Sequence, residues 1–276
     1  IKFTDISFIE YYLDNFEISE VRVYDEKYFT ILKKLLKHKK KVTKIVLKKK
    51  SLNLGIFRLC KNTILNITYI ILSLLCKSKY RKNVFYNSKN IILFSTRVIN
   101  DQLRKDTFQE RYYPGLEKYS KKKKIFFFPI LLFRLNIIKF VKIIDKKQNI
   151  ICEFDVLNLY DYLECFFKSF LIYKYKFKKI YFKDYEVTEL VNNQLNNDFY
   201  SQSLFQNLII YNFIKKIRSN LNIETFVDWF ENQQINRAFN IAVNNYFPKV
   251  KSIGYQGFIV SENFYYFHSP TLLKRN

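Results

Sequence analysis

Residues 224–260, ETFVDWFENQQINRAFNIAVNNYFPKVKSIGYQGFIV, have the pattern of a strand, a helix and a second strand. ETFVDWF (Glu224–Phe230) is a short run of apolar and aromatic residues and predicts a strand. ENQQINRAFNIAVNNYF (Glu231–Phe247) repeats apolar residues at helical spacing, and KSIGYQGFIV (Lys251–Val260) predicts a strand that ends in a turn. A strand that alternates with helices in this way is typical of a parallel sheet with right-handed crossovers.

The sequence before this segment extends the same pattern. NIILFSTRV (Asn90–Val98) is a continuous apolar run that ends in small polar residues, as expected for a buried parallel strand. KIFFFPILLF (Lys124–Phe133) predicts a second strand, and Pro129 indicates an edge position or an early end because proline donates no backbone hydrogen bond. Apolar spacing also predicts helices over Leu159–Phe177 and Ser201–Leu221. A short strand is expected over Glu262–Thr271, near the C-terminus.

We therefore expect an α/β fold, in which residues 86–276 form a Rossmann-like parallel sheet flanked by helices. No GxGxxG motif follows the first strand, so the fingerprint of dinucleotide-binding domains is missing. Residues 1–85 differ, and we expect them to form a basic, mainly helical N-terminal region. The apolar run in it, Ile64–Cys76, is shorter than the roughly 20 residues that a membrane-spanning helix needs. A short buried or interfacial helix is expected there.

The N-terminal region also suggests a membrane surface as a partner. Tyr28–Lys50 alternates apolar pairs with lysine clusters, and the short apolar helix follows it. This combination is typical of proteins that bind anionic lipid peripherally, although a solvated basic face beside a core helix explains it equally well. Residues 1–17 lack the basic and then apolar pattern of a signal peptide. We expect a cytoplasmic protein, with the inner face of the cytoplasmic membrane as the open alternative.

The composition points to a folded protein with a strong positive charge. Hydrophobic residues make up 49% of the chain, and 48 Lys and Arg against 24 Asp and Glu give a formal net charge of +24. Such a charge indicates a polyanionic partner, but Lys far outnumbers Arg, and an AT-rich genome favours lysine for reasons unrelated to binding. Cys60, Cys76, Cys152 and Cys165 are far apart in sequence, which argues against a zinc site and for buried reduced thiols.

The end of the Glu224–Phe230 strand is the first candidate site. Ligands of open α/β sheets bind beyond the carboxyl ends of the strands, and Glu231, Asn232 and Gln233 follow this strand directly. Arg237 lies four residues after Gln233, on a helix face away from the apolar stripe. A carboxylate, two amides and a guanidinium suit a ligand with hydroxyl or phosphate groups. The structural alternative is a helix start with an acidic residue matched to the dipole and ordinary surface residues.

The turn after the last strand of the segment is the second candidate site. Gly254 and Gly257 bracket Tyr255 and Gln256, and glycine permits a positive φ or a close approach of backbone to ligand. Gln256 would then be presented to a ligand from a tight turn. A plain turn with a buried tyrosine is the structural alternative.

These residues resemble a family of enzymes. WFENQQINRAFNIAVNNYFPKVKSIGYQGF, followed by FHSPT, resembles the N-terminal half of bacterial surface-carbohydrate glycosyltransferases of the GT-B type, which act in O-antigen and capsule biosynthesis. ILFSTRV and QERYYPGLEKYSKKKKIFFFPIL are similar to the first strand, a helix start and the second strand of such a domain. The resemblance extends over about Asn90–Thr271.

The resemblance implies an acceptor-side domain and assigns roles to the candidate residues. Glu231 would be the catalytic base or would orient the acceptor, and His268 is the competing base. Arg237 or Arg111 would contact phosphate. The remaining substrate-binding residues would contact sugar hydroxyls or shape the turn that presents them: Asn232, Gln233, Tyr255, Gln256 and Gly257.

The resemblance also implies the partners. A nucleotide sugar would be the donor substrate, bound mainly by a second GT-B domain that this chain lacks, and the acceptor would be a glycan or a lipid-linked sugar. No bound cofactor and no metal are expected, because no DxD motif stands at a strand end. The missing domain and the absence of methionine lead us to expect that the chain is a fragment of a longer polypeptide.

Two other functions stay open beside glycosyl transfer. The charge and the 19% of aromatic residues fit a nucleic-acid-binding protein, but the lysine runs are separated and no helix-turn-helix or RNP motif is present, so nucleic acid is not an expected partner. A non-catalytic scaffold held at an anionic membrane surface by the N-terminal region is the other alternative.

Overall fold

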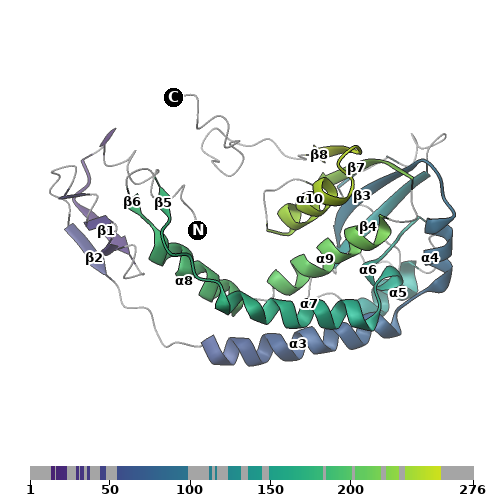
Figure 1. Ribbon diagram of the computed structural model, residues 1–276, viewed down its shortest axis with the longest axis horizontal. Coiled ribbons are helices and arrows are strands. Elements are labelled where there is room, and N and C mark those ends of the chain that lie inside the picture. Colours follow the sequence, from purple (N-terminus) through teal and green to yellow (C-terminus); the bar gives the residue numbers. More distant parts are fainter. Residues whose placement is uncertain are drawn as a thin grey trace. The chain divides into compact units, whose positions relative to one another are not determined.

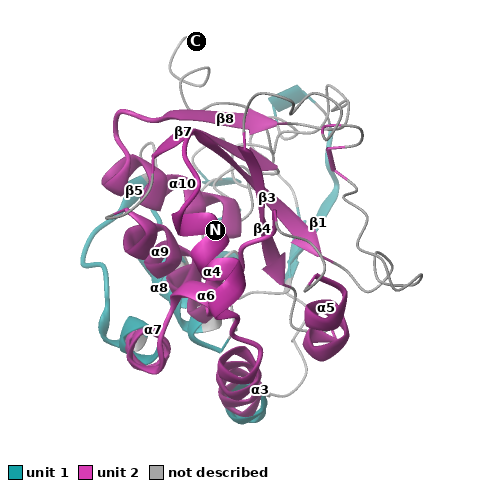
Figure 2. Ribbon diagram, turned by 90° about the vertical axis from the view of Figure 1, so that its right-hand side faces the viewer, with its two compact units in different colours: residues 1–61, 170–201 teal, residues 62–169, 202–276 magenta. Residues whose placement is uncertain are grey.

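The computed structural model (Figure 1) describes residues 14–15, 17–23, 29–30, 32–33, 36–37, 44–47, 55–98, 112–113, 116, 124–131, 136–144, 149–182, 185–200, 203–218, 222–229 and 234–255. The chain forms two compact units (Figure 2). Unit 1 comprises residues 1–61 and 170–201, and unit 2 comprises residues 62–169 and 202–276. The expected division between residues 85 and 86 stays a prediction.

Unit 2 is built on a parallel sheet of four strands, as predicted. Its members are β3 (Ile91–Val98), β4 (Lys124–Leu131), β7 (Ile223–Trp229) and β8 (Lys251–Tyr255), and they lie in the order β4-β3-β7-β8. Among the described strands, β4 occupies an edge of this sheet, in agreement with the position of Pro129. The strand expected at Glu262–Thr271 lies outside the described residues.

Strands β3, β4 and β7 are mostly apolar because both of their faces are covered, whereas the residues of β8 are exposed. On one face, Leu93, Phe126 and Phe226 pack in a single core cluster with α4 (Lys79–Tyr86), α9 (Ser203–Ile217) and α10 (Gln234–Tyr246). On the other face, Phe94 and Val227 belong to a second cluster with α5 (Ile137–Ile144). Figure 2 shows α9 and α10 on one side of the sheet and α5 on the other. The predicted α/β fold with a parallel sheet flanked by helices is confirmed.

The expected helices are present with shifted ends. The apolar run Ile64–Cys76 is part of a longer helix, α3 (Gly55–Leu75). The helix expected over Leu159–Phe177 is α7 (Leu159–Leu171), which continues into a short 3-10 turn, η3 (Ile172–Lys174), and α6 (Glu153–Val156) precedes it. Within the described part of the chain, no helix by itself has the length and apolar composition to cross a membrane, and only α3 and α4 taken together, across a bend of 75°, meet these criteria.

Unit 1 contains two small sheets. Strands β1 (Glu20–Val23) and β2 (Lys44–Leu47) pair in parallel, and β5 (Tyr181–Phe182) pairs with β6 (Tyr185–Glu186) in antiparallel fashion. Helix α8 (Thr188–Phe199) follows β6, and the Thr188 hydroxyl at its start accepts a hydrogen bond from the backbone of Ile180 at 2.9 Å. Most of the basic stretch Tyr28–Lys50 lies outside the described residues, so the basic N-terminal region stays a prediction.

The strand order of unit 2 reverses between β3 and β7. After β3 the chain moves to β4 on one side, and it then returns to the other side of β3 for β7. The carboxyl ends of β3 and β7 therefore flank the point where the order of the sheet reverses. Open α/β sheets bind their ligands at such a switch point.

Candidate functional site

A buried carboxyl group lies at this switch point. Asp228, near the carboxyl end of β7, has no solvent-exposed surface. Its side chain accepts hydrogen bonds from the Ser95 hydroxyl on β3 and from the amides of Asn236 and Asn240 on α10, the amide bonds measuring 3.1–3.2 Å. With Arg97 these residues form what we call the Asp228 network.

The local sequence explains why these side chains meet. Side chains alternate along a strand, so Asp228 lies on the same face of β7 as Phe226 and is directed toward α10. Asn236 and Asn240 are four residues apart, so they lie on one face of this helix. The Asn236 amide also donates to the carbonyl oxygen of Trp229 at 2.6 Å, which ties the first turn of the helix to the end of the strand.

Arg97 adds a positive charge to this network. It follows Ser95 by two residues and so lies on the same face of β3. Its Nη2 atom donates to the Oδ1 atom of Asn236 at 3.2 Å. A guanidinium at the carboxyl end of a strand is suited to bind phosphate or carboxylate oxygens.

The surroundings of Asp228 change its acidity. Burial raises its pKa to about 6, while the hydrogen bonds from Ser95, Asn236 and Asn240 and the charge of Arg97 act in the opposite direction. A carboxyl group with such a pKa takes up and releases a proton near neutral pH. Such groups serve in acid–base chemistry or hold a site together in a pH-dependent manner.

Aromatic rings gather on the opposite face of the same sheet edge. We call this group the aromatic cluster: Tyr112, Tyr113, Trp229 and Tyr255. The ring centroids of Tyr112 and Trp229 lie 4.2 Å apart, and those of Trp229 and Tyr255 lie 5.4 Å apart. The Tyr113 hydroxyl donates to the backbone carbonyl of Ser95 at 3.1 Å and so connects the cluster to the strand that carries the Asp228 network.

Two of the predicted site residues are among the described ones. Arg237 is exposed on α10, and the apolar side of this helix is formed by other residues, as predicted: Phe239, Ala242 and Val243 are buried. Tyr255 ends β8, pairs with Trp229 in the sheet and is partly exposed rather than buried. The other predicted site residues lie outside the described residues, and their roles stay predictions: Glu231, Asn232, Gln233, Gln256, Gly257, His268 and Arg111.

The sequence patterns did not identify the Asp228 network. Asp228 is one acidic residue within an apolar strand, and this was the available signal, because a strand covered on both faces leaves a carboxylate no access to water. Asn236 was not singled out from the sequence, yet it is 1% exposed. A buried asparagine needs hydrogen-bond partners, and Asp228 and Trp229 supply them.

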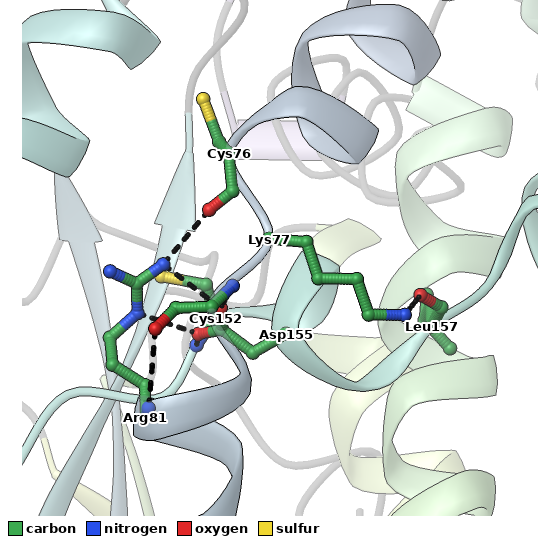
Figure 3. A network of polar contacts seen from close by, with 7 residues as sticks. Cys76, Lys77, Arg81, Cys152, Asp155 and Leu157 are labelled. Atoms are coloured by element: carbon green, nitrogen blue, oxygen red, sulfur yellow. Dashed lines mark hydrogen bonds and ion pairs between the residues drawn. The ribbon is translucent and has the colours of Figure 1, made fainter.

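A second buried network joins α4 to α6 (Figure 3). The guanidinium of Arg81 donates to both carboxylate oxygens of Asp155 at 2.9 and 3.0 Å and to the backbone carbonyl of Cys76 at 3.0 Å. Backbone amides of Ser78 and Cys152 also donate to Asp155. All the hydrogen-bonding capacity of this carboxylate is directed to the protein, so we assign the network to the stability of the fold.

A third buried carboxyl group lies beside a small cavity. Glu153 accepts a hydrogen bond from the Tyr69 hydroxyl, and both residues, together with Gln206 and the carboxyl half of β4, line a cavity of about 20 Å³. That volume suits a single water molecule. Burial raises the pKa of Glu153 to about 7.

Replacing Glu153 with glutamine is expected to change how stability depends on pH. The folded state holds the proton of Glu153 more tightly than the unfolded chain, so the wild-type protein loses stability as pH rises from about 4.5 through about 7. Glutamine cannot ionise but still accepts from Tyr69. We expect Glu153→Gln to be about 1–3 kcal/mol more stable than the wild type near pH 8.5 and nearly equal near pH 5. Urea denaturation at both pH values measures this difference, and an equal effect at both would contradict it.

Metal-ligand groups and cysteine pairs were the other features to look for in the described part of the chain. No group of three or more His, Cys, Asp or Glu side chains able to hold a metal ion occurs among the described residues. All four cysteines are free, as predicted, but Cys152 and Cys165 alone are buried, whereas Cys60 is exposed and Cys76 is half-buried. The expected burial of all four thiols is therefore wrong for two of them, because α3 turns the side chain of Cys60 away from the core.

Comparisons with protein-family models, with curated proteins and with solved structures each found no match to this chain.

Proposed function

We propose that unit 2 is the acceptor-binding domain of a GT-B-type glycosyltransferase of surface-polysaccharide biosynthesis. The observation that carries this proposal is the position of the Asp228 network, at the switch point between β3 and β7. A carboxyl group, two amides and a guanidinium meet there, at the edge of the sheet where α/β domains bind ligands. Arg97 and Asn240 are partly exposed and would contact sugar hydroxyls, which both donate and accept hydrogen bonds, while the buried carboxyl group and the other amide hold them in place.

The aromatic cluster supports the same class of ligand. Binding sites for small organic ligands combine apolar and aromatic walls with a few polar groups that fix orientation. The C–H faces of a sugar ring pack on aromatic rings, and the exposed Tyr255 offers such a ring beside the strand ends. The sequence resemblance to surface-carbohydrate glycosyltransferases supports the sugar as ligand independently, since it rests on Trp229–Phe258 and not on the geometry.

The proposal gives separate roles to the described and the predicted residues. Asp228 is enclosed by three hydrogen-bond donors, so we assign it to positioning Asn236 and, through it, Arg97. Glu231 is proposed as the base that takes the proton of the acceptor hydroxyl, with His268 as the alternative. The nucleotide-sugar donor would bind chiefly to a second GT-B domain, with Arg237 or Arg111 near its phosphates and without a metal.

The single tryptophan of the chain offers a direct test. Trp229 belongs to the aromatic cluster and is the only tryptophan, so tryptophan fluorescence, excited at a wavelength that tyrosine does not absorb, reports on this site. We expect hexoses, N-acetylhexosamines or their oligosaccharides to change this fluorescence in a saturable manner. Replacing Tyr255 with alanine is expected to weaken the apparent affinity about three- to tenfold, because a ring contact is lost.

Tyr80 provides the matched control for this experiment. It is an exposed tyrosine on α4, so Tyr80→Ala removes an equal ring without touching the aromatic cluster. A response to single-stranded oligonucleotides but not to sugars would replace the proposal with nucleic-acid binding. A fluorescence that no sugar changes, or equal affinities of Tyr255→Ala and Tyr80→Ala, would contradict it.

A further inference from the structure

Helix α3 has an apolar stripe that the protein core does not cover. Within unit 2, its core-facing side chains include Tyr69, Ile70 and the buried Ser73. Large exposed side chains recur on the opposite side at intervals of three or four residues: Ile64, Ile67, Ile71 and Leu75. A surface helix of a globular protein usually exposes polar residues instead, so this stripe is expected to have a partner.

Helix α7 has a second stripe of the same kind. Tyr162 and Cys165 face the core, in the same cluster that contains Tyr69 and Ile70 of α3. The exposed side of α7 again consists of large apolar residues: Leu159, Tyr160, Leu163 and Phe167. The two helices lie side by side in both views (Figures 1 and 2), and because they turn their inner sides to one cluster, their stripes lie on the outside together. We call these eight residues the α3–α7 surface.

The charges around this surface are positive. Residues 62–98 contain no Asp or Glu, and Lys77, Lys79 and Lys82 follow α3 at its C-terminal end. The acidic groups of α7 are neutralised by ion pairs, Glu164 with Lys168 and Asp161 with Lys216 at 2.6 Å. The apolar surface is therefore bordered by lysines, and the two carboxylates on α7 are each paired with a lysine.

We propose that the α3–α7 surface docks on an anionic lipid bilayer, with the eight apolar side chains inserted at the level of the headgroups and the lysines in contact with lipid phosphates. Apolar residues bordered by lysine are the pattern of interfacial helices, and each lysine near an anionic surface adds attraction. A second copy of the chain fits less well. A symmetric dimer through this surface would bring the lysines of both copies together, and like charges at an interface repel. This proposal does not depend on the proposed sugar site, because the α3–α7 surface includes no residue of the Asp228 network or the aromatic cluster.

Co-sedimentation of the full 276-residue chain with vesicles tests the proposal. We expect binding to phosphatidylcholine vesicles that contain phosphatidylglycerol and little binding to phosphatidylcholine alone. Added salt should release the protein, because screening shortens the reach of the lysines. Lys79→Glu reverses a charge, so it should weaken vesicle binding by more than the roughly fivefold effect of removing one positive charge near an anionic surface.

Substitutions in the apolar stripes separate insertion from attraction by charge alone. Combining Ile71→Asn with Phe167→Asn should reduce the partition of the protein onto vesicles at least about tenfold, because two apolar side chains that would insert into the bilayer are removed. Ile241→Asn is the matched control: it lies on helix α10, and its side chain is 54% exposed against 53% for Ile71. All three side chains are more than half exposed, and circular dichroism checks that all variants keep the fold.

Three results would overturn the proposal. The first is equal vesicle binding by the double variant and Ile241→Asn, and the second is equal binding to vesicles with and without phosphatidylglycerol. The third is the absence of vesicle binding together with a concentration-dependent dimer, measured by sedimentation, that Ile71→Asn and Phe167→Asn abolish. That result would assign the α3–α7 surface to a second copy of the chain.

Discussion

Replacing Arg81 with methionine is expected to lower the free energy of unfolding by about 3–5 kcal/mol. Arg81 is 1% exposed and binds both oxygens of Asp155, which is fully buried. Methionine fills a similar volume but donates no hydrogen bond, so the carboxylate keeps only its two backbone donors. Burial raises the pKa of Asp155 and Arg81 acts against this rise, so the variant carboxyl should be protonated up to a higher pH. Urea denaturation followed by circular dichroism measures the loss.

A surface ion pair is the control for this prediction. Lys168 and Glu164 are four residues apart on α7 and are largely solvated, so Lys168→Met should change stability by about 0.5 kcal/mol or less. Replacing both Arg81 and Asp155 with apolar residues should cost less than the sum of the two single replacements, because no unpaired charge is left behind. Equal losses for Arg81→Met and Lys168→Met, or an additive double variant, would show that the buried pair contributes nothing specific.

The sheet of unit 2 could be predicted from the sequence because its signals are local. β3 and β7 are rich in apolar residues, which strands covered by helices on both faces require. Pro129 indicated an edge position or an early end for its strand, because proline has no backbone N–H to donate to a neighbouring strand. β4 lies at an edge among the described strands. The ends of elements were less accurate. The helix expected at Ile64–Cys76 begins at Gly55, since residues before Ile64 lack a long apolar run but still propagate the helix.

The candidate site could not be predicted in the same way, because its contacts join distant parts of the chain. Ser95 and Asp228 are 133 residues apart, and Arg97 and Asn236 are 139 residues apart. No short motif records such pairs, and an Asn on a helix has the same local pattern whether it faces solvent or a buried carboxyl group. The sequence analysis selected the end of β7 as a candidate site, and the structure places Trp229 and Tyr255 side by side at the ends of β7 and β8. The predicted residues Glu231–Gln233 follow the end of β7, whereas Asp228 lies just before it.

Replacing Asp228 with alanine is expected to remove the sugar-dependent change of Trp229 fluorescence or to weaken its apparent affinity about 10–100-fold, the effect of losing hydrogen bonds to a charged group. Alanine leaves Asn240 and Asn236 without their shared acceptor, so α10 loses its link to Ser95 on β3 through this carboxyl group. Arg97 then donates to an Asn236 side chain that no longer binds the carboxyl group of residue 228. Fluorescence titration of the variant with the sugars that bind the wild type measures the loss.

Asp228→Asn separates the charge of this group from its geometry. Asparagine keeps one acceptor for the helix amides, and its own amide can donate to the Ser95 hydroxyl, so the strand end should stay in place. The folded-state pKa of Asp228, about 6, lies above its ordinary value, so the wild type loses stability as pH rises through about 6, whereas the asparagine variant lacks this contribution. Sugar affinity close to that of the wild type in Asp228→Asn, combined with its loss in Asp228→Ala, would identify Asp228 as a positioning residue. Wild-type affinity in the alanine variant would mean that the network only holds α10 to the sheet and that the sugar binds elsewhere.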